Sequence, residues 1–422
     1  DLKKARALIQ ESGVNVGAQS YFDAEATMTI STKGFLVMTQ EGSMVLTGKR
    51  ALDFSGAVSA EDNLGIGGFE RIMGPSGQAQ ALVGDIAAGH HLLTLHAELV
   101  TPGPDGKPVI LATGDAEERN ICEYPYPARF GHDFRCVGDI FSEEHNPGRK
   151  KPFSVQPVMH AVRDADAPWV ERWSAMVDGA EGVVVSETRV GGIPVGMIGV
   201  EAMGFPRMGQ IPPDGPENWT PSTLFPRGSY KIARALSAFS GQVPAIILAN
   251  LSGFDGSPES LRSWQLIHGA EIGRALVNFK GPVLLTVLSR YHGGAYVVFS
   301  TALNSRMEAI ALSGSYASVI GGAAAAAVVF DSSISAEVEK NPEVARLRKL
   351  METAAGKERI RIESRLEELR LELKVQLQKE TAERFDRVHS VQRAARVGSL
   401  KTVIEPFQLR PYIIGFLRTH CR

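Results

Sequence analysis

Cysteine is scarce in this sequence and follows no recognisable pattern. The 422 residues include three cysteines, Cys122, Cys136 and Cys421, and none is spaced as Cys-x-x-Cys. This excludes a disulfide framework and a cysteine-rich zinc site. We therefore expect reduced, intracellular thiols.

Long apolar runs and net charge are also lacking. No run reaches the ~18–20 apolar residues of a spanning helix, and the basic and apolar regions of a secretory leader are missing. Lys and Arg total 45 against 47 Asp and Glu, a formal net charge of -2. With positive and negative charges nearly balanced, the protein has no overall electrostatic attraction to a polyanion such as nucleic acid. We expect a folded cytoplasmic protein with neither nucleic acid nor membrane as partner. Because the chain begins at Asp1 rather than Met, we also expect a fragment or processed product.

The common catalytic signatures are missing too. The sequence contains no Gly-x-Ser-x-Gly elbow, no Walker loop and no Gly-x-Gly-x-x-Gly between a strand and a helix. The adjacent His90 and His91 point in different directions on any regular element and lack a partner at His-Glu-x-x-His spacing. We interpret them as surface or packing residues and expect no metal.

Composition and apolar spacing divide the chain into four segments. Residues 1–100 are rich in small residues, with strand-like runs at 35–38 and 44–46. Residues 101–152 are polar and rich in proline, which predicts a linker. Residues 153–332 alternate apolar runs (193–200, 244–249, 283–288) with helical patterns (224–239, 261–279), the order of an α/β domain. Residues 333–422 carry leucines at three- and four-residue steps among mixed charges, which predicts long amphipathic helices. These helices are either solvated or docked on a partner subunit.

One arrangement occurs twice. In the first copy, the segment Val14–Tyr21 leads into a predicted helix and is followed by the run 44–52. In the second copy, Arg290–Tyr296 leads into a predicted helix and is followed by the run 309–317. A Gly-Ala or Gly-Gly-Ala step after a strand lets a ligand approach the backbone. Amides at the start of the next helix can then face developing negative charge. Two such turns predict a pair of oxyanion holes, each donor worth ~3–4 kcal/mol in the transition state.

Several motifs resemble the carboxyltransferase component of biotin-dependent acyl-CoA carboxylases, most of all the single-chain bacterial enzymes in which all components are fused. The similar segments are Val243–Ser260, Gly269–Ile272, Gly191–Gly196, Arg290–Ala295, Ser318–Gly322, Leu46–Lys49, Ser59–Gly68, His389–Ala394 and Leu409–Tyr412. The resemblance extends over nearly the whole chain.

The resemblance implies a crotonase-like ββα spiral of two related domains with a C-terminal helical extension. Residues 1–100 would be a partial acyl-CoA domain lacking an upstream half, and 101–152 the linker. Residues 153–332 would be the biotin domain, which 333–422 complete.

The resemblance also implies an active site at a dimer interface. Gly17 and Ala18 would hold the thioester enolate, while Gly294 and Ala295 would hold the ureido oxygen of biotin. Gly293 and Tyr296 would line the biotin site, and Val297 the acyl cavity.

Some assignments stay open at this point. In some relatives an arginine precedes the Gly-Gly step; here His292 stands there and Arg290 lies two positions earlier. Either could face the carboxyl group, or His292 could simply be packed in the core. Lys49, Arg50 and Arg71 either meet CoA phosphates or are solvated surface charges.

The expected function is carboxyl transfer from carboxybiotin to the α-carbon of an acyl-CoA. No Ala-Met-Lys-Met biotinylation motif and no ATP-binding glycine loop occurs in the sequence. Biotin would therefore arrive on a separate carrier, and ATP would be used by a separate biotin carboxylase. We expect a homo-oligomer, a dimer or a trimer of dimers. The alternatives are a crotonase-fold decarboxylase or isomerase, because enolate stabilisation serves these reactions also, and a non-catalytic carboxylase subunit.

Overall fold

Apolar runs form the strands of a central mixed sheet in the computed structural model, which describes residues 6–28, 32–104, 106–131 and 133–421. Its strand order is β17-β15-β14-β12-β8-β7-β6, with β16 added to the end of β14. Neighbouring strands from β17 to β8 are parallel, while β7 is antiparallel to β8 and to β6. The strands are β6 (Val170–Arg172), β7 (Val183–Val190), β8 (Ile193–Val200), β12 (Ala245–Leu251), β14 (Val283–His292), β15 (Met307–Leu312), β16 (Tyr316–Ser318) and β17 (Thr402–Ile404).

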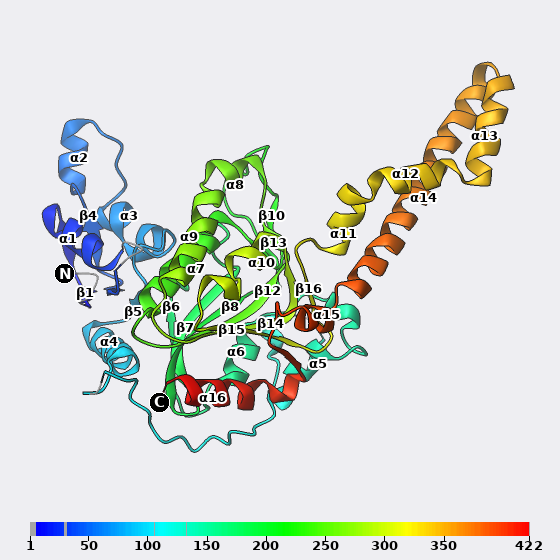
Figure 1. Cartoon of the computed structure of the whole chain (residues 1–422). Coiled ribbons are helices and arrows are strands. Elements are labelled where there is room, and N and C mark those ends of the chain that lie inside the picture. The colour runs from blue at the N-terminus through cyan, green and yellow to red at the C-terminus, as the bar shows by residue number, and fades with distance from the viewer. Residues whose placement is uncertain (1–5, 29–31, 105, 132, 422) are drawn as a thin grey trace.

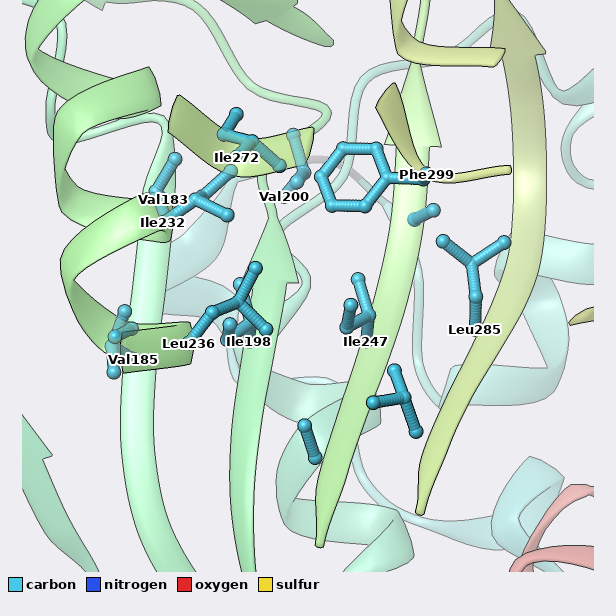
Figure 2. Packing of buried hydrophobic residues seen from close by; sticks show 14 of the residues in the cluster. Val183, Val185, Ile198, Val200, Ile232, Leu236, Ile247, Ile272, Leu285 and Phe299 are labelled. Carbon is cyan, nitrogen blue, oxygen red and sulfur yellow. The ribbon is translucent and has the colours of Figure 1, made fainter. Parts of the chain in front are cut away.

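Helices cover both faces of this sheet, which is why its central strands β8 and β12 are nearly continuous apolar runs rather than alternating ones. Every residue of β8 and β12 is buried. On one face, Ile232 and Leu236 of α7 point toward the strand side chains Ile198 and Ile247 (Figure 2). The covering helices are α7 (Pro226–Phe239) and α9 (Gln265–Val277) on that face, and α6 (Gln156–Val162) and α16 (Leu409–His420) on the other.

A smaller unit precedes the central sheet and lies at its β6 edge (Figure 1). It contains a parallel three-stranded sheet, β1-β3-β5, and a separate parallel pair, β2 and β4. Its elements are β1 (Leu8–Glu11), β2 (Val14–Val16), α1 (Ala18–Thr27), β3 (Phe35–Thr39), β4 (Ser43–Val45), α2 (Lys49–Ser55), α3 (Asn63–Gly67), β5 (Ala81–Val83) and α4 (Ile86–Val100). His90 and His91 lie exposed on α4.

The segment expected as a linker, residues 101–152, packs against the central sheet as well as connecting the two units. Ile121, Val137 and Ile140 are fully buried in the cluster beneath β8 and β12. Its main helix is α5 (Val137–Phe141). Proline and glycine thus shape an irregular but packed covering layer.

A helical arm projects from the central sheet, as the leucine spacing predicted (Figure 1). It consists of α11 (Gly322–Ala324), α12 (Asp331–Glu339), α13 (Pro342–Thr353) and α14 (Gly356–Val388), after which α15 (Val391–Arg396) returns to the sheet. The predicted helix at 261–279 is interrupted. Trp264 adopts the left-handed conformation (φ 70°), which separates α8 (Pro258–Arg262) from α9.

A buried ionic network joins the N-terminal unit to the central sheet. The Glu187 carboxylate on β7 contacts His96 Nδ1 of α4 and accepts a hydrogen bond from Arg172 Nη1 of β6 at 3.0 Å. Arg172 Nη2 also donates to the Gly34 carbonyl and to Gln80 Oε1, both at 3.0 Å. Burial lowers the pKa of His96, so this imidazole is neutral and donates its single proton.

Removing one member of this network should weaken the contact between the N-terminal unit and the central sheet. We expect Glu187→Ala to lower the free energy of unfolding by about 3–5 kcal/mol, because Arg172 would keep a buried charge without its partner. Urea denaturation measures the change. Glu61→Ala, which removes the carboxylate of the exposed Arg71–Glu61 pair, is the control and should leave the unfolding curve unchanged. Similar urea unfolding curves for both variants would contradict a stabilising role for this ionic network.

Candidate functional site

The repeated arrangement seen in the sequence forms two equivalent turns. In the first, β2 lies parallel to β4 and ends at Gly17, where α1 begins. In the second, β14 lies parallel to β16 and ends at Gly293, where α10 (Gly294–Val298) begins. Gly17 has φ 71° and ψ -127°, and Gly293 has φ 66° and ψ -145°. The two turns therefore share one backbone conformation, which side chains other than glycine rarely adopt.

In both turns the glycine amide is already used. The Gly17 amide donates to the Val45 carbonyl at 2.9 Å, and the Gly293 amide donates to the Val319 carbonyl at 3.0 Å. The following residues, Ala18 and Gly294, are the first residues of their helices, where amides have no intrahelical acceptor. Both are exposed. The donors available to a ligand are therefore Ala18 and Gly294, whereas Gly17 shapes its turn.

The second turn rests on buried side chains. Ala295 is fully buried in the core, so its side chain faces away from any ligand. A Cβ on Gly294 would lie 2.7 Å from the Phe254 ring, so glycine is required where that ring supports the turn. Tyr296 is half-buried, and its ring lies 5.3 Å from the ring of Tyr291. Phe254 was not anticipated as a site residue; its place beside Gly294 depends on the pairing of β13 (Gly253–Phe254) with β11 (Thr223–Leu224).

The first turn rests on a buried cluster of two carboxyl groups and an amide. Asn15 Nδ2 donates to Glu11 Oε1 at 3.1 Å and to Asp23 Oδ2 at 2.5 Å. Burial and the neighbouring Asp23 raise the pKa of Glu11 to about 7. Ser20 Oγ donates to the Val45 carbonyl at 3.3 Å. These contacts tie β1, β2, β4 and α1 together beneath the turn.

A groove opens beside the second turn. Its volume is about 220 Å³, and Tyr296, Val319, Phe385, His389 and Arg393 are among its lining residues. The Phe385 and His389 rings stack at 3.9 Å on the returning end of α14. The segment 389–394, similar to the carboxyltransferase sequences, thus reaches Tyr296, although about 100 residues separate them in the sequence.

His292 and Arg290 lie on β14 just before this turn, and the structure gives them different surroundings. His292 is 5% exposed, and its Nδ1 contacts Ser318 Oγ at 3.0 Å. Burial and the nearby Arg290 charge lower its pKa, so the imidazole is neutral. The Arg290 guanidinium lies over the Tyr316 ring, 5.6 Å from its centroid, and lines a separate cavity of about 350 Å³. That cavity also contains Lys150, Arg387 and three carboxylates.

The cations expected near CoA phosphates lie in the N-terminal unit. Lys49 pairs with Asp53 at 2.7 Å, and Arg71 pairs with Glu61 at 2.5 Å. Arg50 is exposed on α2. Val297, expected at the acyl cavity, is 59% exposed on α10. A phosphate would have to compete with carboxylates for Lys49 and Arg71, so their role in CoA binding stays a prediction.

Comparison with known proteins identifies the family of this chain. A family model described as "Carboxyl transferase domain" matches residues 25–421. The chain belongs to the carboxyl transferase domain family. The resemblance drawn from the sequence is thereby confirmed.

Curated relatives of the family are much longer than this chain. An acetyl-CoA carboxylase, mitochondrial, of Saccharomyces cerevisiae (strain YJM789) is 28% identical over 282 residues, 64% of this chain and 12% of that protein. An acetyl-CoA carboxylase of Dictyostelium discoideum is 26% identical over 308 residues, 70% of this chain and 13% of that protein. The chain thus spans well under two thirds of the length of these relatives.

A solved structure supports the fold. The crystal structure of transcarboxylase 12S, a hexamer with methylmalonyl-coenzyme A and methylmalonic acid bound, matches with TM-score 0.69 and 19% identity. The match covers 98% of this chain and 65% of that one. It confirms the expected α/β, crotonase-like fold of this carboxyl transferase domain.

The described part of the chain offers neither a metal-binding cluster nor a membrane-spanning helix. Within the ranges that the structure describes, no cluster of three or more His, Cys, Asp or Glu side chains is placed to hold a metal ion. The same residues include no helix long and apolar enough to cross a bilayer.

The strained glycine of the second turn can be tested directly. We expect Gly293→Ala to lower the free energy of unfolding by about 1–2 kcal/mol, because alanine would have to adopt a left-handed conformation. Gly415→Ala is the matched control: Gly415 lies within α16, and open space surrounds its missing Cβ. That variant should be neutral or more stable. Thermal and urea unfolding distinguish them, and an unchanged Gly293→Ala protein would contradict the conformation described for this turn.

Proposed function

We propose that this carboxyl transferase domain moves a carboxyl group between biotin and the α-carbon of an acyl-CoA. The main support is the pair of equivalent turns, each of which presents an exposed amide after a left-handed glycine. Proton removal α to a thioester needs stabilisation of one enolate oxygen, and biotin presents a second polar oxygen at its urea. Two backbone donors match these two needs.

The two donors take different reactants in this proposal. The Ala18 amide, at the start of α1, holds the thioester oxygen as negative charge develops on it. The Gly294 amide, at the start of α10, holds the urea oxygen of biotin. Bound carboxybiotin supplies the carboxyl group, and its urea nitrogen is basic once that group has left. A side-chain base is then unnecessary, which agrees with the burial of His292 and the contact of its Nδ1 with Ser318 Oγ.

The groove beside α10 fits the biotin ring system in chemical character. Tyr296, Val319 and Phe385 offer apolar walls, while Ser318 and Arg393 provide polar groups. A small ring system with an apolar thioether side and a polar urea side needs this combination. Tyr296, two residues after Gly294, lies at one wall. Tyr296 and Gly293 therefore keep their proposed places in the biotin site, whereas Arg290 lines the neighbouring cavity.

The proposal includes partners and a location. Acyl-CoA is the substrate, and a biotin carboxyl carrier and a biotin carboxylase act on other domains or chains. The domain limits at residues 100, 152 and 332 also stay part of the proposal. A cytoplasmic location is proposed as well, although one yeast relative is named mitochondrial.

Two substitutions of Gly294 distinguish the effect of losing its amide N–H from the steric effect of an added Cβ. Gly294→Ala adds a Cβ against Phe254 but keeps the N–H, whereas Gly294→Pro adds a similar Cβ and removes the N–H. Proline is well tolerated at the first position of a helix. We expect Gly294→Pro to reduce carboxyl transfer between methylmalonyl-CoA or malonyl-CoA and free biotin by about 10²–10³-fold relative to Gly294→Ala, the usual effect of one oxyanion donor.

The alternatives predict different results in that assay. A decarboxylase or isomerase would retain biotin-independent turnover of the acyl-CoA in the Gly294→Pro variant. A non-catalytic subunit would show no turnover before mutation and would bind neither acyl-CoA nor biotin. Equal rates for Gly294→Pro and Gly294→Ala would refute the role of the amide.

Exposed apolar side chains surround both turns and support an oligomer. Near the first turn, Val16, Tyr21, Phe22 and Leu46 are 50–67% exposed. Near the second turn and the start of the arm, Val297, Val319, Val328 and Val329 are 59–75% exposed. Apolar surface of this kind is typical of interaction sites. We propose that the first face of one copy packs on the second face of another, which forms a two-fold dimer with two equal sites.

A charge placed on the first face tests this assembly. We expect Phe22→Glu to shift the protein to monomers in light scattering, because the carboxylate would be buried without a partner. Carboxyl transfer should fall with the dimer fraction. Phe407→Glu is the control, since Phe407 is similarly exposed (51%) but lies near α16. A fully dimeric Phe22→Glu protein would exclude this face from the interface.

A further inference from the structure

A further cavity lies at the end of the central sheet opposite the Gly293 turn. The parallel strands β12 and β14 start at this end, with Ala245 and Val283, and β14 ends at the proposed biotin turn. The cavity has a volume of about 290 Å³ and lies between two loops, residues 241–244 and 280–282. Parallel α/β sheets usually bind their ligands at the carboxyl ends of the strands. The catalytic proposal therefore does not account for this cavity.

The lining of this cavity is cationic. Lys107, Lys280, Arg306 and His420 contribute to it, and none of its described lining residues is acidic. Among the described residues, neither Lys280 nor Arg306 has a carboxylate within ion-pair distance. The nearest acid in the adjoining cavity, Glu308, is already bound by Lys401 at 2.6 Å and by the Tyr412 hydroxyl.

A further lysine adds to the local positive charge. Lys33 Nζ donates to the Ser240 carbonyl at 2.7 Å, next to the loop at 241–244. A Cβ built on Gly241 would lie 3.8 Å from Lys33 Nζ and 3.6 Å from Lys280 Cβ, so the two lysines flank this glycine. Burial, followed by the charges of Arg6 and Lys280, lowers the pKa of Lys33. The positive charges of Lys33 and Lys280 therefore lie close together and repel each other. A bound anion would reduce this repulsion.

The loops provide room for a compact anion. Gly241 and Gly281 have positive φ values of 69° and 147°, and neither glycine has a side chain that would cover the cavity. A volume of 290 Å³ corresponds to roughly ten water molecules at about 30 Å³ each. This is enough for a phosphate or diphosphate group with its first hydration waters, but too small for a whole dinucleotide.

We propose that this cavity is an anion site for a phosphate-bearing small molecule, held by Lys280 and Arg306. The Arg306 guanidinium offers forked donors to two phosphate oxygens, and the Lys280 ammonium offers a point charge from the loop at 280–282. His420 stands at the rim with Nδ1 donating to the Phe416 carbonyl at 2.8 Å, which leaves Nε2 as the atom available to a ligand. The site is separate from the carboxyl-transfer turns and does not rest on the proposed function.

Calorimetric titration of the full chain with pyrophosphate tests the proposal. We expect saturable binding that weakens as KCl is raised, and a loss of at least tenfold in affinity in the double variant Lys280→Gln/Arg306→Gln. Lys357→Gln/Arg359→Gln, on α14 of the helical arm, removes the same two positive charges and should bind like the parent protein. Inorganic phosphate should bind more weakly than pyrophosphate, because it offers less charge to the two opposed cations.

Other outcomes would overturn the proposal. Absence of pyrophosphate binding, or equal binding by the double variant, would exclude a phosphate site here. Binding of a polyglutamate peptide without binding of pyrophosphate would instead indicate a protein docking surface. Carboxyl transfer by the double variant should stay within twofold of the parent, which separates failure of this proposal from failure of the proposed function.

Discussion

The architecture of both candidate donors depends on a left-handed glycine that directly follows a parallel strand. At Gly17 and Gly293 the chain must leave a strand and enter a helix within one residue, while the glycine amide still bonds to the neighbouring strand. This bond fixes the turn. The next amide then projects from the end of the strand pair with no backbone acceptor of its own. Its position is set by strand pairing rather than by any side-chain rotamer, so such a donor requires little reorganisation when charge develops.

The two turns are supported in different ways, and the difference reflects where each lies. The second turn continues β14, a central strand whose residues are almost all buried between two helical layers. The first turn follows a three-residue strand paired only with another short strand. Its support comes from the Glu11, Asn15 and Asp23 cluster instead. Because burial and the neighbouring Asp23 raise the pKa of Glu11 to about 7, this cluster changes protonation near neutral pH, and the first turn is the more sensitive of the two to pH.

Much of the fold follows from local sequence pattern. The apolar runs at 193–200, 244–249 and 283–288 are strands β8, β12 and β14, because strands buried on both faces leave a continuous apolar signal. The break at Trp264 could not be predicted in this way, since a left-handed conformation is rare for tryptophan and leaves no trace in the apolar pattern. The packing of residues 121–141 under the sheet was missed for a related reason. A segment rich in proline and glycine gives no periodic signal even when its few apolar residues are buried.

The two turns were predictable in kind, but the residues that carry their free amides were not. The repeated Gly-Ala and Gly-Gly-Ala steps marked both turns correctly, but sequence alone could not tell which amide each strand pair would use. The amides of Gly17 and Gly293 are already hydrogen-bonded in the structure. The free donors are therefore the next amides along the chain, Ala18 in the first turn and Gly294 in the second. Phe254 and the groove residues Phe385 and His389 arise from contacts between distant segments. Motif similarity at 389–394 could suggest that they matter, but not that they lie beside Tyr296.

The chemistry proposed here also explains why ionisable side chains are poor candidates for the reacting groups. His292 is buried, its pKa is lowered, and its Nδ1 is engaged by Ser318 Oγ. Arg290 is directed to a different cavity, where carboxylates surround it. A strong base near a thioester would have to be kept ionised in an apolar groove at considerable cost. Neutral amide donors avoid that cost and still stabilise an oxygen that becomes negative only during the reaction, which is the stage at which stabilisation raises the rate.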